Sequence, residues 1–160
     1  MKEVTEILEI VFERVQLDKI VEFLIRVLSS STLKDYNIST DSSEINLQSK
    51  EKLFSSISQS SDGAFYFNFL DYSLKDILLS NLGIQILKYN NVYDLNLSID
   101  EKEIRQKVSI LDLQKRVASL AEELKTTCYY CGYEPAMDEE TRIFSGGSLG
   151  PLKDWGNMDK

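Results

Sequence analysis

The sequence of 160 residues contains no histidine. Histidine is the usual general base at neutral pH and the commonest metal ligand among the side chains. Without it, a Ser-His-Asp triad cannot be assembled, and most catalytic metal sites lose their preferred donor. We therefore expect no catalytic residues, no cofactor and no metal, and we expect that the chain is not an enzyme.

Cysteine is also scarce, because only Cys128 and Cys131 are present, spaced as C-x-x-C. This pair is half of a four-ligand zinc site, and the chain has no other cysteine or histidine to complete it. A redox pair would need its first thiol at a helix N-terminus, whereas these residues follow a predicted helix and lie in a strand-like segment. In a strand the two side chains would point to opposite faces. We interpret both cysteines as structural.

Basic side chains are outnumbered, since 18 Lys and Arg stand against 26 Asp and Glu, for a net charge of −8. Nucleic acid binding needs a positive surface that displaces counterions, so we expect no nucleic acid partner. The balance favours a basic macromolecular partner instead. No apolar run reaches the ~20 residues that cross a bilayer, and the N-terminal segment lacks the basic start of a secretory signal. We expect a cytoplasmic protein that binds no membrane.

The length predicts a single domain over residues 1–160. Flexibility of the C-terminal tail, about residues 152–160, is left open. In the N-terminal segment, two apolar stripes recur at helical spacing but do not share a face. They predict two helices, about 2–15 and 19–29, with Asp18 as the N-cap of the second. The alternative is that both stripes belong to a single helix that is packed against the rest of the protein on two of its sides. Ser49 opens a further short helix, with Leu53, Phe54 and Ile57 facing inward.

Alternation of side chains predicts strands in the middle of the chain. Residues 64–72 place Phe65, Phe67 and Phe69 on one face. Asn90 and Asn91 separate two alternating segments, which predicts a hairpin with a two-residue turn.

Capping patterns predict helices near these strands. They indicate a short helix through residues 73–79 with a stop near Gly83, a short helix or turn near 101–107, and a long helix over about 110–126 that begins after Ser109. Weaker strand signals lie at residues 36–40 and 44–48, and two more segments, 128–133 and 142–146, favour strands. The predicted fold is α+β: a mainly antiparallel sheet of about five or six strands packed against the N-terminal helices and the long helix.

Acidic residues gather between the last two predicted strands, at Glu134, Asp138, Glu139 and Glu140. Carboxylates in such a group could act as a general acid and base or bind a hard cation. All four lie in one loop without a second cluster elsewhere, so we interpret them as surface charge.

The C-terminal part of the chain resembles the immunity proteins (antitoxins) encoded beside bacterial polymorphic or contact-dependent growth-inhibition toxins. A helix leads to an aromatic strand, then to Gly-x-Glu-Pro-Ala, an acidic turn and Thr-x-x-Phe; Cys131 departs from the pattern. The likeness covers residues 113–152 and not the N-terminal half. It implies a non-catalytic protein that binds and blocks one cognate toxin domain. The residues that carry it are Gly132, Glu134, Pro135, Ala136, Thr141 and Phe144.

Many such toxins are nucleases with basic clefts, so the resemblance implies a basic partner. An acidic inhibitor would associate quickly through electrostatic steering. Tyrosine and tryptophan often dominate the binding free energy of an interface. The alternative interpretation of each tyrosine is that it is partly buried in the sheet. A protein-interaction or regulatory domain with another partner is the alternative function, and an enzyme using paired carboxylates is a third. The predicted partner-binding residues are Tyr130, Tyr133, Glu134, Asp138, Glu139, Glu140 and Trp155.

Overall fold

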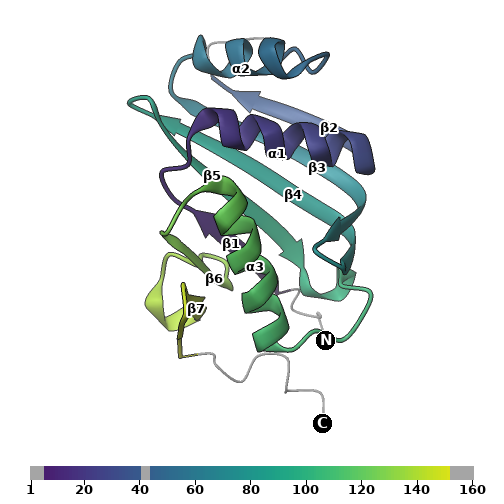
Figure 1. Cartoon of the computed structure of the whole chain (residues 1–160), viewed down its shortest axis with the longest axis vertical. Coiled ribbons are helices and arrows are strands. Elements are labelled where there is room, and N and C mark those ends of the chain that lie inside the picture. The colour runs from purple at the N-terminus through teal and green to yellow at the C-terminus, as the bar shows by residue number, and fades with distance from the viewer. Residues whose placement is uncertain (1–5, 41–43, 152–160) are drawn as a thin grey trace, which may run out of the picture.

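The computed structural model describes residues 6–40 and 44–151 of the chain. Over these residues the protein is α+β, with an eight-stranded antiparallel sheet in the order β2-β3-β4-β5-β1-β6-β7-β8 (Figure 1). The helices are α1 (Leu17–Ser30), α2 (Lys50–Ser58) and α3 (Ile110–Leu124), with short 3-10 turns η1 (Glu101–Glu103) and η2 (Glu139–Thr141). The strands are β1 (Ile7–Phe12), β2 (Thr32–Ser39), β3 (Gly63–Leu74), β4 (Ile77–Tyr89), β5 (Val92–Asp100), β6 (Tyr129–Tyr133), β7 (Arg142–Ser145) and β8 (Ser148–Leu149).

The helices of the described chain cover one face of the sheet. α1 and α3 lie across the strands, and α2 lies beside α1 near the β2 edge (Figure 1). One row of paired strand residues points into this layer and is at most 1% exposed at each position. We call the other side the open face, because no helix within residues 6–40 and 44–151 covers it. The buried row runs through Phe67, Ile84, Leu97, Ile10, Cys131 and Phe144.

The prediction of a helix over residues 2–15 is wrong in the part that the structure describes. Residues 7–12 form β1, which pairs antiparallel with β5 on one side and β6 on the other. Leu8 and Phe12 are buried under the helices, while Val11 is buried on the open face under a loop that reaches it from far along the sequence. Burial on both faces removed the alternation that marks a strand, and the remaining spacing imitated a helix.

The second predicted helix of the N-terminal region exists as α1. It begins earlier than expected, with Gln16 at the N-cap, and Asp18 lies in its first turn rather than capping it. α2 is capped by Ser49, whose hydroxyl accepts a hydrogen bond from the Lys52 backbone. Of the three α2 side chains predicted to point inward, Leu53 and Ile57 are fully buried, but Phe54 is 39% exposed.

The helix predicted at residues 73–79 is wrong as well. Ser73 and Leu74 end β3, and Lys75 and Asp76 make a tight turn with φ values of 47° and 77°. The chain returns at once as β4, which continues through Gly83. The capping-box spacing was coincidental, because the pairing of β4 with β3 from Ile77 to Lys88 outweighs a local helical preference.

Other local predictions are confirmed. β3 includes residues 64–72, and Asn90 and Asn91 form the turn between β4 and β5 with φ values of 49° and 60°. Positive φ at both central residues is what such a two-residue hairpin requires. Ser109 caps α3, its side chain accepting from Asp112 N. The weak strand signal at 36–40 belongs to β2, whereas 44–48 is not a strand over the described residues, and the sheet is larger than the five or six strands expected.

Candidate functional site

The loop over residues 134–141 is held in shape by Arg142, the first residue of β7. Its guanidinium donates to the carbonyl of Ala136 at 3.2 Å and to that of Met137 at 2.8 Å. The same group lies 4.5 Å from the centre of the Tyr130 ring, a cation–π geometry. Thr141 closes the loop by donating its hydroxyl to the carbonyls of Pro135 and Asp138, at 2.8 and 3.1 Å. The loop is therefore internally bonded before any partner binds.

Close packing explains two further residues of the signature. A Cβ at Gly132 would lie 2.5 Å from the Thr141 carbonyl oxygen, so β6 and β7 can approach only if this position is glycine. Ala136 is fully buried in a small cluster with Val11 and Tyr130 on the open face. The loop thus folds back over β1 and β6.

This fold leaves the predicted acidic side chains at the surface. Glu134, Asp138, Glu139 and Glu140 are all exposed. Tyr130 lies beside the loop but is only 7% exposed, so its ring supports the loop more than it presents a free surface. Burial raises the pKa of the Tyr130 hydroxyl, and the nearby Glu13 carboxylate raises it further.

Two carboxylates that sequence reasoning missed lie on the same side. Glu9 on β1 accepts the Ala136 N–H at 3.2 Å, and burial raises the pKa of its carboxyl group; the Ala136 bond opposes this rise and the charge of Glu134 adds to it. Glu13 follows β1 and accepts from the Cys128 thiol at 3.1 Å. The period-two spacing of Glu9, Val11 and Glu13 would have indicated them if the segment had been interpreted as a strand.

The structure does not bring all predicted residues together. Tyr133 pairs with Leu8, so its side chain lies on the helix-covered face, away from Tyr130. It is half-buried and its hydroxyl donates to Glu101 at 3.1 Å. Trp155 and the tail at 152–160 lie outside the described residues.

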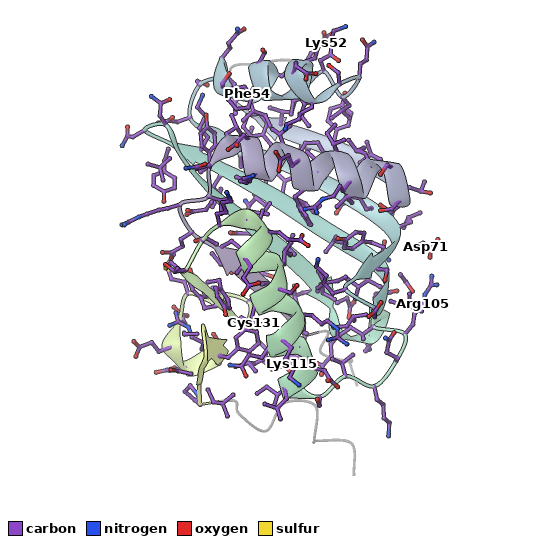
Figure 2. All side chains as sticks on the ribbon, in the orientation of Figure 1. Lys52, Phe54, Asp71, Arg105, Lys115 and Cys131 are labelled. Carbon is purple, nitrogen blue, oxygen red and sulfur yellow. The ribbon has the colours of Figure 1, made fainter. Side chains whose placement is uncertain are left out.

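The two cysteines are free; Cys131 lies in β6, and Cys128 directly precedes that strand. Cys131 is fully buried behind α3 (Figure 2), and burial raises the pKa of its thiol. Cys128 is exposed, but its hydrogen bond to Glu13 and the negative charge of that group also raise the pKa of its thiol. Both thiols are therefore held in the less reactive protonated form, which supports a structural role.

Other kinds of site find little support in the described part of the chain. No cluster of three or more His, Cys, Asp or Glu side chains there is arranged to hold a metal ion. A cavity of about 290 Å³ lies between α1, α3 and the β3–β4 turn, but Glu123 pairs there with both Arg26 and Lys75. None of the helices over residues 6–40 and 44–151 has the length and apolar character to cross a membrane.

Comparison with known proteins gives a family. Residues 6–148 match the family described as "PABL017 Cdi1I immunity protein". No curated protein matches the sequence.

Among solved structures, a chain matches in a 1.75 Å crystal structure of the toxic C-terminal tip of CdiA from Pseudomonas aeruginosa in complex with immune protein. The TM-score is 0.75 and the identity 30%, over 93% of this chain and 99% of that one. The Pseudomonas aeruginosa T6SS protein PA0821 matches with a TM-score of 0.45 and 12% identity, over 82% of this chain and 45% of that one, which is too low to bear on fold or function. The resemblance seen in the C-terminal sequence is confirmed, and it now extends over both halves of the molecule: the chain belongs to the PABL017 Cdi1I immunity protein family.

Proposed function

We propose that this protein binds the toxic C-terminal domain of one cognate secreted toxin and blocks it without catalysing a reaction. The observation that carries the proposal is family membership over residues 6–148. The likeness to a chain from a complex between a CdiA toxic tip and its immune protein supports the same partner class, because 99% of that chain is matched.

We infer that the toxin domain presents a basic surface, as a nuclease does, and that this protein occludes it. The bonded loop at 134–141 displays Glu134, Asp138, Glu139 and Glu140 toward solvent. An array of carboxylates can imitate the phosphates that a nuclease cleft attracts, and it steers association. A loop ordered before binding loses little conformational entropy on docking, which favours tight binding. Contact of Tyr133 and Trp155 with the toxin domain remains a prediction.

The direct test is co-expression with the toxin C-terminal domain encoded by the neighbouring reading frame. The proposal expects that the protein restores growth to cells producing that domain and co-purifies with it. If growth is not restored and the two proteins do not co-purify, the proposed function is wrong. Restored growth without a stable complex would contradict occlusion as the mechanism.

A charge reversal tests the part played by the loop. Glu139→Lys combined with Glu140→Lys should leave stability within about 0.5 kcal/mol of wild type, because both side chains are exposed. Association with the toxin domain should slow by about tenfold at low salt, and the difference should shrink as salt screens the charges. Surface plasmon resonance at several salt concentrations measures both effects.

The matched control is Glu51→Lys with Glu122→Lys, which makes the same change in net charge on α2 and α3. Both of these side chains are exposed. If the control slows association as much as the loop variant does, net charge rather than the loop controls binding.

A further inference from the structure

The open face of the sheet is strongly acidic beyond the loop. The alternation of side chains along the strands places carboxylates on this face from β2, from β5, and from β1 and the residue that follows it. The Arg142 guanidinium also lies there, but its donors are engaged by Ala136, Met137 and Ser145. Arg14 and Lys34 lie at the rim, after β1 and at the irregular point of the β2–β3 pairing. The carboxylates are Asp35, Asp94, Asp100, Glu9 and Glu13.

The helical layer on the opposite side has no such bias. α1, α2 and α3 together carry six acidic and six basic side chains. Several of these pair with each other, as Lys50 does with Glu22 at 2.9 Å and Arg26 with Glu123 at 3.1 Å. The excess negative charge of the sheet is therefore directed to the open face, and a cationic partner would be attracted to that side of the molecule.

A hydrogen-bonded row of side chains crosses the middle of the open face. The amide of Asn96 on β5 donates to Gln85 on β4 at 3.2 Å, and Gln85 donates to the Tyr66 hydroxyl on β3 at 2.6 Å. The three residues are directly opposite one another in the strand register. Such bonds orient the side chains on a rigid sheet before a partner arrives.

The two ends of this row differ. Tyr66 is 43% exposed and so offers an aromatic face to a partner. Asn96 is 8% exposed, and its Oδ1 has no hydrogen-bond partner among the described residues. A buried acceptor without a partner is uncommon and costs free energy.

We propose that the open face between β3 and β6 docks a cationic segment of the toxin domain, so that the interface continues from the 134–141 loop across the sheet to Tyr66. This inference rests on the proposed function and names the surface that performs it. Lysine or arginine side chains would add positively charged donors to the carboxylates, whose present donors among the described residues are uncharged groups. An arginine or the stem of a lysine would pack on Tyr66.

The test places opposite charges at one exposed position, Tyr66→Lys and Tyr66→Glu. Both variants lose the ring and the bond to Gln85, so any difference between them reports charge alone. We expect Tyr66→Lys to associate with the toxin domain about threefold to tenfold more slowly than Tyr66→Glu at low salt, with the gap closing at high salt. Phe54→Lys on α2 is the matched control, since it replaces another exposed aromatic on the helical side, and it should bind as wild type does.

Several results would overturn the inference. Equal association rates for the two Tyr66 variants would show that no cationic segment docks there, and a loss in Phe54→Lys equal to that in Tyr66→Lys would place the interface elsewhere. A dimer of the free protein that Tyr66→Lys dissociates would show that a second copy covers the face. If Tyr66→Lys does not fold, Asp35→Lys on the same face repeats the test. Wild type that fails to bind the toxin domain would instead refute the proposed function, so the two failures are distinguishable.

Discussion

Lys88 on β4 makes the sharpest test of how the fold is held together. Its side chain points into the helical layer and is 4% exposed. The ammonium donates to the carbonyls of Ile57 at 3.1 Å, Ser58 at 2.9 Å and Ser60 at the end of α2. The Ile57 carbonyl also accepts from the backbone N–H and the hydroxyl of Ser60, at 3.3 and 2.7 Å. The helix dipole places partial negative charge at this end of α2. A single buried lysine thus caps α2 and joins it to the sheet.

The expected cost of Lys88→Met follows from these contacts. Three hydrogen bonds to a charged group contribute about 1.5–3 kcal/mol each, or roughly 5–9 kcal/mol in total. Removing the ammonium also removes its desolvation penalty of several kcal/mol, and Ser58, which is half-buried, can regain water. We therefore expect a net loss of about 3 kcal/mol in the free energy of unfolding. For a chain of this size that lowers Tm by roughly 6–12 °C.

Urea denaturation of Lys88→Met and of Lys52→Met measures the effect. Lys52 lies on α2 itself but is exposed, with one hydrogen bond to Gln48, and Figure 2 places it at the outer end of the helical layer. Its replacement should change the free energy of unfolding by no more than about 0.5 kcal/mol. The reasoning is refuted if the two variants are equally stable. Faster amide exchange in α2 of the Lys88 variant would identify the helix that loosens.

Two other predictions concern the loop and the strand beneath it. Gly132→Ala should destabilise the protein by about 1–3 kcal/mol in urea denaturation, because the new methyl group collides with the Thr141 carbonyl; Gly147→Ala, with open space around it, is the control and should be near neutral. Burial raises the folded-state pKa of the Glu9 carboxyl group, so the native protein binds the carboxyl proton more tightly than the unfolded chain does. The ionised Glu9 therefore destabilises the fold above this pKa, and the destabilisation is lost as the pH falls through it. The stability of Glu9→Gln relative to wild type should therefore be more favourable at about pH 7 than at about pH 4, and a difference that does not vary with pH would contradict this assignment.

Local patterns in the sequence predicted the elements whose stability is local. The Asn90–Asn91 turn, the Ser109 cap of α3 and the alternating phenylalanines of β3 were all identified, because each signal depends on neighbouring residues. One failure was β1, where pairing with the distant strands β5 and β6 decides the conformation. The other was the β3–β4 turn, where Lys75 and Asp76 close a local hairpin although their spacing imitates a helix cap. Because residues 7–12 were predicted as a helix, Glu9 and Glu13 were not identified as neighbours. Their side chains point to the same face only when the segment is a strand.

The sequence by itself determined the α+β class, the acidic balance, the absence of histidine chemistry and the family signature that begins at Gly132. Each of these depends on composition or on short-range spacing. Only the tertiary structure decided that β1 lies between β5 and β6, that Lys88 caps α2 and that Arg142 fastens the acidic loop over Tyr130. For β1 and Lys88 the physical reason is that the contacts join residues far apart in the chain. Arg142 is near its loop in sequence, but its position depends on the pairing of β7 with β6 and on the burial of Tyr130, which no local pattern records. The separation of charge between a balanced helical layer and an acidic open face arises in the same way, because strand register determines which carboxylates share a side.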